Sequence, residues 1–471
     1  LFACLYSATV SWLLIPDLLY LAPSLRKQQL SLRDINQNNI PRLGGVAILI
    51  GILLAFLLFD WLPLEERGVE WVSIADLNYH IILFYGFLAW LLGFIDDLIN
   101  LNFKWKLSGQ IVLAILTVIF VNRIQSIDLP FFGIGVDLGI WSWPFSILWI
   151  LLVMNSMNLV DGVDGLAGGI GITSIVFLCI FSFLNSQIYL ALFLMMVLGA
   201  TLGFWVYNKP PAKIFLGDSG AYLLGYLLAV LSLEASVNKR DDLTLAPLIL
   251  LALPLMETLL TIVRRFLKGI PFYSADRDHI HHRLLRKGYS PTKTICVLIS
   301  ISFGYGIFSS LLHFFPKFQG FVLIGVVAFS YCILQILEYD FIKRPLYSVQ
   351  SQTKYRSHRA LIQALTDDID NFFSKDPDND CVIRSFQYWA NLIEIYYVGV
   401  LLEGSLLSKQ GEIDKSHHLM LYQDRICEIR ITIPEDCWNT DTEVKLALLD
   451  RVVNSLMIRL NELALKSNKT Q

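Results

Sequence analysis

Apolar stretches separated by short polar segments run along most of the chain. Each stretch is long enough to cross the roughly 30 Å hydrocarbon core of a bilayer as a helix. The pattern predicts eleven transmembrane helices, near residues 1–22, 43–62, 79–95, 107–121, 144–160, 165–184, 187–206, 220–236, 244–263, 294–315 and 320–341. We therefore expect an all-α polytopic membrane domain over residues 1–341, with its N-terminus outside and its first helix retained as a membrane span.

Polar residues dominate after residue 341, where we expect a small soluble α/β domain of unassigned role. Segments Leu361–Phe373 and 443–466 have helical spacing, and Glu428–Ile433 alternates like a short strand. His417 and His418 are expected to lie in a solvated turn and not to bind a metal. Every residue with candidate chemistry lies earlier in the chain, so we do not expect this domain to take part in catalysis.

Lys and Arg residues are unevenly distributed between the predicted loops. With the N-terminus outside, the loops on one face carry sixteen of them and the loops on the other face carry five. Loops rich in Lys and Arg remain on the cytoplasmic side of a membrane. We therefore expect a multi-pass protein of the inner (plasma) membrane, in which the cytoplasmic segments are 23–42, 96–106, 161–164, 207–219, 264–293 and the C-terminal domain 342–471.

Composition supports the membrane assignment and excludes other classes. Hydrophobic residues make up 55% of the 471 residues and charged residues only 16%, with a mean hydropathy of +0.57. Soluble domains contain about 25% charged residues. The net charge of −3 leaves no basic surplus of the kind that binds nucleic acid. The seven cysteines are scattered, which argues against a disulfide framework and a zinc site.

Four polar clusters fall at the predicted cytoplasmic ends of helices, and this convergence indicates one shared site. The first is Asp96-Asp97, which is followed by Lys104 and Lys106. Adjacent carboxylates repel each other unless a cation such as Mg²⁺ or a lysine lies nearby. The alternative for this cluster is a helix end that simply meets water.

The second cluster lies between residues 155 and 169. Asn155, Asn158 and Asp161 recur every third residue, which places them on one face of a helix, and Asp164 follows. The glycines that come next allow a ligand to approach the backbone closely. The alternative is a polar seam between two packed helices.

The third cluster, Lys213–Gly220, lies where the chain is predicted to re-enter the membrane. Asp218 is at the start of a helix, so it would act either as an N-cap or as the metal ligand of a diphosphate site. Phe215, three residues earlier, would be free to stack on a base.

The fourth cluster, Asp276–Arg283, contains three histidines in the most basic loop. Their spacing does not match a zinc site, whereas Arg and His together are suited to bind phosphate. The alternative is a basic loop without a binding role. If residues 279–282 are helical, His279 and His282 share a face and His281 points elsewhere.

Carboxylates that could hold Mg²⁺, next to cationic side chains at a membrane surface, suit a diphosphate substrate that is attacked by a lipid-borne group. The chain contains no Gly-Lys pair and hence no Walker A loop, so ATP-driven pumping is unsupported.

These motifs resemble those of the polyprenyl-phosphate N-acetylhexosamine-1-phosphate transferases, glycosyltransferase family 4. The resemblance spans about residues 33–290 and rests on Pro41–Gly45, Asp96-Asp97, Asn155–Gly165, Phe215–Gly220 and His279–His282. It implies a Mg-dependent enzyme that transfers N-acetylglucosamine-1-phosphate, or a related N-acetylhexosamine-1-phosphate, from a UDP-sugar to undecaprenyl phosphate and releases UMP. Such a reaction would start a lipid-linked glycan of the cell envelope, such as lipopolysaccharide or a cell-wall polymer.

The resemblance also implies roles for single residues. Asp218 and Asp97 would bind Mg²⁺, for which Mn²⁺ is an alternative, and Phe215 would stack on uracil. The implied catalytic residues are Asp96, Asp97, Asp161, His279 and His282. The implied substrate-binding residues are Lys104, Lys106, Asn158, Asp164, Phe215, Arg265, Arg277 and His281.

Two positions depart from the family pattern: Asn100 stands where a third carboxylate is common, and Glu257 stands where Asp is expected. A lipid phosphate has a second pKa of about 6 and is mostly dianionic at neutral pH. We therefore expect Asp96 and Asp97 to position the metal or the nucleophile, with proton abstraction by one of them as the alternative.

Two other classes of membrane protein stay open at this point. One is an intramembrane Mg-dependent prenyltransferase, which also uses Asp pairs, although its further carboxylates are missing after Asp97. The other is a secondary transporter, whose polar residues would cluster at the middle of the membrane in repeated halves. Whether the protein forms a homodimer is left open as well.

Overall fold

The computed structural model describes residues 1–26, 40–61, 77–121, 123–129, 134–236, 244–268 and 279–337, and four strands between residues 397 and 433. The chain divides into two compact units. The first consists of Leu1–Phe266 and Ile270–Lys343, and the second contains Arg344–Gln471 together with Leu267–Gly269.

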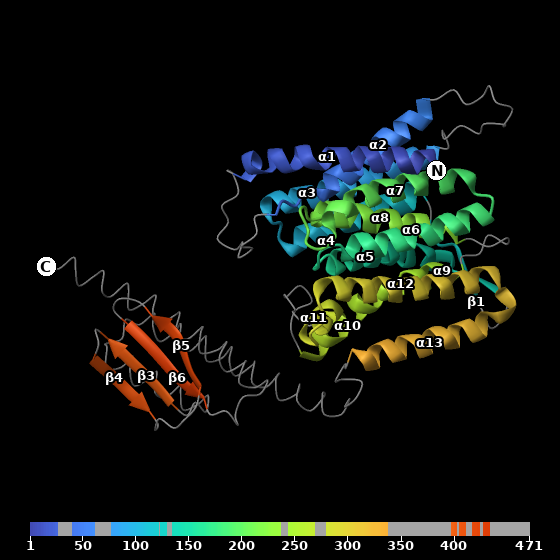
Figure 1. Cartoon of the computed structure of the whole chain (residues 1–471). Coiled ribbons are helices and arrows are strands. Elements are labelled where there is room, and N and C mark those ends of the chain that lie inside the picture. The colour runs from blue at the N-terminus through green and yellow to red at the C-terminus, as the bar shows by residue number, and fades with distance from the viewer. Residues whose placement is uncertain are drawn as a thin grey trace. The chain divides into compact units, whose positions relative to one another are not determined.

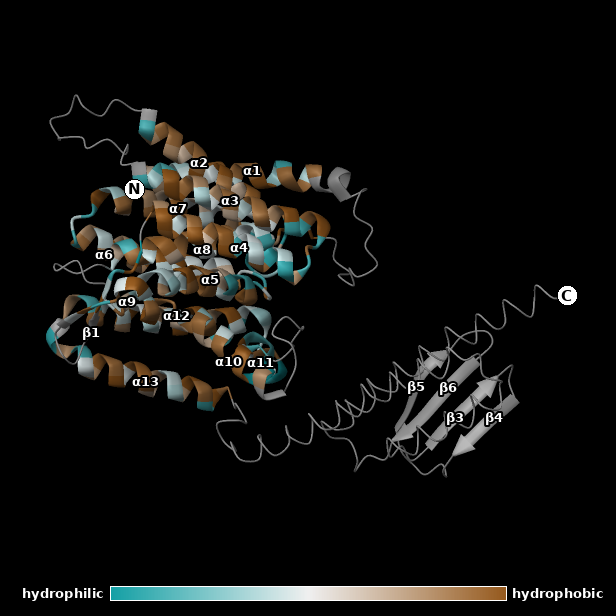
Figure 2. Ribbon diagram, turned by 180° about the vertical axis from the view of Figure 1, so that it is seen from behind, coloured by the Kyte–Doolittle hydropathy of each residue, from teal (hydrophilic) through white to brown (hydrophobic). Residues whose placement is uncertain are grey.

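Helices make up most of the first unit (Figure 1). They are α1 (Phe2–Arg26), α2 (Gly44–Trp61), α3 (Leu77–Ile99), α4 (Phe103–Phe120), α5 (Ser142–Val160), α6 (Leu166–Leu184), α7 (Ile188–Asn208), α8 (Gly217–Ala235), α9 (Ala246–Leu250), α10 (Ala252–Lys268), α11 (Ile280–Arg286), α12 (Pro291–Phe314) and α13 (Gln319–Ile336). In the described part of the chain, eight helices are long and apolar enough to cross a membrane: α1, α3, α4, α5, α6, α7, α12 and α13. Figure 2 shows hydrophobic residues along these helices and hydrophilic residues gathered near their ends. The prediction of a polytopic helical membrane domain is confirmed.

Three of the eleven predicted spans differ from these eight helices. α2 is apolar but shorter. α8 is buried along almost its whole length, so it packs against protein instead of lipid and tolerates polar residues. The single span predicted at 244–263 is wrong in one respect, because the chain forms two helices there, α9 and α10. Pro254 has no N–H to donate to Leu250, and its ring obstructs the preceding turn, which favours a break in the helix here.

α8 lies at the centre of the first unit, packed against α2, α3, α5 and α6. Gly93 of α3 allows a close approach: a Cβ there would lie 2.4 Å from the backbone oxygen of Asp218. On another side, a Cβ at Gly225 of α8 would lie 2.7 Å from the Cα of Met154 in α5. These contacts hold the start of α8 beside the ends of α3 and α5, which carry two of the predicted polar clusters.

One element of the first unit departs from the all-α expectation. An antiparallel hairpin of β1 (Ser126–Leu129) and β2 (Ile134–Asp137) connects α4 to α5. It follows the C-terminal end of α4, away from Lys106 and the other residues of the predicted site.

In the second unit the structure describes an antiparallel sheet in the order β4-β3-β6-β5. Its strands are β3 (Tyr397–Leu402), β4 (Ser405–Gln410), β5 (His417–Gln423) and β6 (Cys427–Ile433). β6 confirms the strand predicted over Glu428–Ile433. The turn predicted at His417 and His418 is wrong, because both residues pair with β6 at the start of β5. The predicted helical segments 361–373 and 443–466 lie outside the described residues.

Candidate functional site

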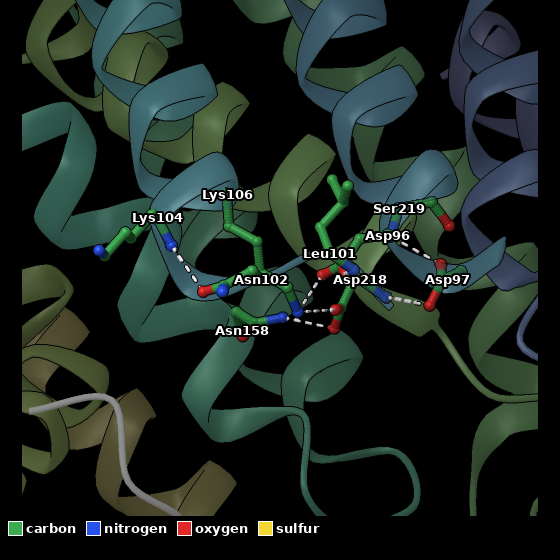
Figure 3. Close-up of polar contacts among 9 residues, drawn as sticks. All are labelled: Asp96, Asp97, Leu101, Asn102, Lys104, Lys106, Asn158, Asp218 and Ser219. Atoms are coloured by element: carbon green, nitrogen blue, oxygen red, sulfur yellow. Dashed lines mark hydrogen bonds and ion pairs between the residues drawn. The ribbon is translucent and has the colours of Figure 1, made fainter. Parts of the chain in front are cut away.

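A carboxylate from α3 holds the first turn of α8. Asp97 Oδ1 accepts a hydrogen bond from the backbone N–H of Asp218, and Asp97 Oδ2 accepts one from Ser219, both at 3.0 Å (Figure 3). The first N–H groups of a helix have no partner within the helix, and the helix dipole favours a negative charge there. Asp97 therefore caps α8. The side chain of Asp218, which lies in the same first turn, is not needed as the cap.

The Asp218 side chain faces polar groups from other helices. Its Oδ1 accepts a hydrogen bond of 2.7 Å from Asn158 Nδ2, and its Oδ2 lies 3.5 Å from the ammonium of Lys106. The same ammonium forms an ion pair with Asp96, whose side chain is only 1% exposed. Asp96 Oδ1 also accepts a hydrogen bond of 2.8 Å from the backbone N–H of Leu101. Residues from α3, α4, α5 and α8 therefore meet at one point (Figure 3).

Of the two predicted lysines, the structure places only Lys106 at these carboxylates. Lys104 lies in the first turn of α4, where its backbone N–H donates to the side chain of Asn102, the N-cap. Its own side chain is exposed and, in Figure 3, points away from Asp96 and Asp218.

Backbone pairing joins the Pro41–Gly45 motif to the segment that precedes α8. The N–H of Phe215 donates to the oxygen of Pro41, and the N–H of Gly44 donates to the oxygen of Phe215, both at 2.9 Å. Gly217, with φ at +77°, then turns the chain into α8 in a conformation that favours glycine. Phe215 is thus fixed at its backbone, while its side chain is only half-buried.

Arg42 is a cation near the site to which the sequence-based interpretation gave no role. It lies close enough to Asp161 for its positive charge to favour the ionised carboxylate. The sequence could have indicated a role for Arg42 through its position inside the Pro41–Gly45 motif. The backbone of this motif pairs with the segment that leads into α8.

Asp161 and Asp164 flank the turn that follows α5. Asp161 is the C-cap residue of α5. Burial above all, and then the negative charges of Asp218 and Asp97, raise the pKa of Asp161 well above its usual range. Asp164 Oδ2 accepts a hydrogen bond of 3.0 Å from the backbone N–H of Ala212, so it holds the loop before α8 in place.

Glu257 on α10 connects the histidine motif to the bundle. Its Oε1 lies 2.7 Å from His279 Nδ1, and its Oε2 accepts a hydrogen bond of 2.9 Å from the backbone N–H of Ile280. Both Glu257 and His279 are buried. The Glu257 carboxylate thus fixes the start of α11 through two adjacent residues. Glu257, where the family pattern has Asp, therefore has a structural role.

The three histidines lie together, because the condition under which His281 was expected to point elsewhere, a helix over residues 279–282, is not met. α11 begins only at Ile280, so His279 is its N-cap residue and its ring stacks on that of His281 with centroids 5.5 Å apart. The rings of His281 and His282 are 4.4 Å apart. His281 also packs against Gly162, where a Cβ would lie 3.0 Å from Nε2. The fourth cluster therefore touches the second.

His281 is also electrically neutral at neutral pH. Its burial, with smaller contributions from His282 and His279, lowers the pKa of His281 to about 3. It can donate or accept a hydrogen bond but adds no positive charge to the site.

Of the two arginines predicted to bind substrate, the structure describes one. Arg265, on α10, is half-buried beside Arg264, whose Nη2 donates to Thr261 Oγ1 at 3.2 Å. Arg277 lies outside the described residues.

The donors at Asp218 fit a divalent cation. Among the described residues, no three His, Cys, Asp or Glu side chains form a group that could hold a metal alone. Mg²⁺, however, commonly takes one or two carboxylates and completes its shell with water and substrate phosphate. Asp96 and Asp218 offer such a pair, and the ammonium of Lys106 already occupies a cation position beside both. Both oxygens of Asp97 bond to backbone N–H groups, so a metal role for Asp97 stays a prediction.

Removal of the Glu257 carboxylate is expected to destabilise the protein. In Glu257→Ala the buried N–H of Ile280 and the His279 ring lose their partner, and an unsatisfied buried group costs about 1–3 kcal/mol. We expect the free energy of unfolding to fall by about 2–4 kcal/mol, measured as a lower Tm in detergent. Glu257→Gln keeps one acceptor oxygen and should lose less. An unchanged Tm for Glu257→Ala would contradict the role of Glu257.

Comparison with known proteins connects this geometry to a family. The family model of glycosyl transferase family 4 matches residues 79–236, which include Asp96, Lys106, Asn158 and Asp218. A probable undecaprenyl-phosphate N-acetylglucosaminyl 1-phosphate transferase of Bacillus subtilis is 32% identical over 285 residues, covering 60% of this chain and 76% of that protein. A decaprenyl-phosphate N-acetylglucosaminephosphotransferase of Mycobacterium leprae is 33% identical over 324 residues, covering 63% and 80%. An undecaprenyl-phosphate alpha-N-acetylglucosaminyl 1-phosphate transferase of Salmonella typhi is 27% identical over 336 residues, covering 69% and 88%.

Proposed function

The chain belongs to glycosyl transferase family 4, and on that basis we propose that it transfers N-acetylglucosamine-1-phosphate to a polyprenyl phosphate. The observation that carries the proposal is the convergence of Asp96, Lys106, Asn158 and Asp218, from four helices, at one end of a membrane bundle. The relatives in Bacillus subtilis, Mycobacterium leprae and Salmonella typhi are named for this kind of transfer.

The proposed donor is UDP-N-acetylglucosamine and the proposed acceptor is undecaprenyl phosphate. An oxygen of the lipid phosphate attacks the phosphorus that carries the sugar. The bond from this phosphorus to the bridging oxygen breaks, and UMP leaves with that oxygen. The lipid phosphate is mostly dianionic at neutral pH, because its second pKa is about 6, so no residue has to remove a proton from it.

Each group of the site has a part in this reaction. Lys106 presents a positive charge to the diphosphate, and Asp96 and Asn158 keep Lys106 and Asp218 in position. When bound at Asp218, Mg²⁺ or Mn²⁺ would neutralise the charge that develops on the phosphate oxygens. Asp161 and Asp164 would line the nucleotide pocket, as the family resemblance implies.

The histidine cluster lies beside these groups and is suited to the sugar phosphate. His279 is oriented by Glu257, and His282 is half-buried next to it. Both would donate hydrogen bonds to the sugar or the diphosphate, while neutral His281 would complete the pocket wall and Arg265 would add charge.

We further propose that this end of the bundle faces the cytoplasm of a plasma membrane. The support is the excess of Lys and Arg in the loops at this end. In this arrangement α2, α8 and the α9–α10 pair each cross the membrane in addition to the eight apolar helices. Because eleven is an odd number of crossings, the two termini then lie on opposite sides of the membrane. With the N-terminus outside, the C-terminal domain lies in the cytoplasm.

A radiolabelled donor tests the proposed reaction directly. Full-length protein in detergent would be incubated with UDP-N-acetylglucosamine labelled in the sugar, Mg²⁺ and undecaprenyl phosphate. We expect label in a butanol-extractable lipid and release of UMP. Transfer of the prenyl chain itself would favour a prenyltransferase, and uptake of intact UDP-sugar into vesicles without lipid labelling would favour a transporter.

Phe215→Ala is expected to raise the KM for the UDP-sugar about 5- to 150-fold, because stacking of a base on an aromatic ring contributes about 1–3 kcal/mol. The KM for the lipid should stay the same, and Phe215→Tyr, which keeps a ring, should remain close to wild type. An equal rise in both KM values for Phe215→Ala would instead indicate a packing role.

A further inference from the structure

We propose that Lys106 is the resident cation of the site, and that its ammonium opposes metal binding at Asp218 until a nucleoside diphosphate draws the lysine aside. The inference rests on the proposed function, from which it takes the diphosphate and the metal. It assigns to Lys106 control over the order in which the site fills.

Lys106 occupies a cation position beside Asp218. Asn158 covers Oδ1 from one side at 2.7 Å, whereas Oδ2 lies 3.5 Å from the Lys106 ammonium. That ammonium also contacts the buried carboxylate of Asp96. Figure 3 shows the lysine side chain reaching down from α4 into the space between the two acids. A divalent ion at Oδ2 would therefore lie next to the ammonium unless Lys106 moved.

Electrostatics makes the two cations competitors. In a partly buried site two positive charges a few ångströms apart repel strongly, because little water lies between them to screen the charges. Without the ammonium, the carboxylates of Asp96 and Asp218 lose the cation that contacts both of them, and their affinity for a divalent cation must rise. The lysine thus protects the site from nonproductive metal binding.

A diphosphate reverses this relation. Its oxygens attract both the ammonium and the metal, and the long, flexible side chain of Lys106, which is 28% exposed, can rotate toward them without moving α4. Metal and nucleotide should then each increase the affinity of the other by the same factor. Part of this coupling should disappear when Lys106 is removed.

The chain provides a matched control for this test. Lys104 is on the same helix, so Lys104→Met changes the net charge as Lys106→Met does. Its side chain is exposed and points away from Asp96 and Asp218 (Figure 3).

The experiment measures binding of Mn²⁺ to the full-length protein by electron paramagnetic resonance, without nucleotide. We expect the Kd of Lys106→Met to be at least about tenfold lower than that of the wild type, and the Kd of Lys104→Met to lie within about twofold of it. Lys106→Gln, measured in the same way, is a second test in case the Met variant fails to fold. Thermal unfolding compares the stability of all three variants with that of the wild type.

A second arm adds saturating UDP, with a correction for the Mn²⁺ that UDP binds in solution. UDP should lower the Kd of the wild type at least about tenfold and that of Lys106→Met by a smaller factor. Equal Kd values for wild type and both Lys106 variants without UDP would overturn the inference, as would an equal effect of Lys104→Met.

Failure of the inference is distinguishable from failure of the proposed function. Wild-type protein that labels lipid but binds Mn²⁺ no more weakly than Lys106→Met refutes the role of Lys106 alone. Wild-type protein that labels no lipid refutes the proposed reaction, whereas tighter Mn²⁺ binding by Lys106→Met would still support Lys106 as the resident cation.

Discussion

Replacement of Asp218 by Asn is expected to lower kcat/KM for the UDP-sugar at least about 1,000-fold, which corresponds to about 4 kcal/mol of transition-state stabilisation. The amide has the size of the carboxylate and keeps an oxygen for Asn158. It lacks the negative charge that faces Lys106 and would hold the metal. The lipid-labelling assay with the purified variant measures the loss.

The protein should remain folded in this variant, because the cap of α8 comes from Asp97 and the backbone of Asp218 is unchanged. Asp137→Asn is a suitable control, since Asp137 lies on β2 after the far end of α4 and its side chain accepts a hydrogen bond from the N–H of Gly139. Its kcat/KM should stay within about twofold of wild type. Turnover of Asp218→Asn near the wild-type rate, with its metal dependence intact, would refute the assignment.

Asp97→Ala is expected to lower both stability and activity. The substitution removes two charge-assisted hydrogen bonds to the first turn of α8, and we expect unfolding to become about 2–4 kcal/mol easier. The same turn carries Asp218, and a displacement of about 1 Å at a reacting centre can cost about 100-fold in rate. We therefore expect kcat/KM to fall at least about 100-fold, together with a lower Tm.

If stability and activity fall together, Asp97 acts mainly as the cap of α8. Asp97→Asn keeps one acceptor oxygen, so its Tm and its activity should lie between those of wild type and Asp97→Ala. If Asp97→Ala abolished transfer without any change in Tm, Asp97 would act on the metal or the substrate directly, as the family resemblance implies, and not mainly as a cap.

Hydrophobic pattern was a reliable guide to the helices that face lipid and a weaker one to those that do not. Each of the eight apolar helices has a counterpart among the predicted spans, because a lipid-exposed helix has to be apolar over its whole length. α8 is surrounded by protein, so its composition is less constrained. The break between α9 and α10 depends on Pro254, which an average over an apolar window does not register.

Motifs also indicated the general place of the site but not its internal contacts. The C-terminal ends of α3 and α5 and the start of α8 were expected to meet, and they do so at Asp96, Asn158 and Asp218. The sequence offered no reason to prefer Lys106 over Lys104, since the two differ only in the direction of their side chains from α4. Asn100, one of the departures from the family pattern, has a φ of +50° at the end of α3, a conformation that Asn tolerates better than most residues.

By itself, therefore, the sequence determined the membrane class, the residue types of the site and the end of the bundle where they gather, because these follow from local pattern and loop charge. Only the tertiary structure decided the partners: Asp97 with the start of α8, Lys106 with Asp96 and Asp218, and Glu257 with His279. Each pair joins helices far apart in the chain. Such contacts depend on helix packing at closely approaching residues such as Gly93, and no property of the single segments encodes them.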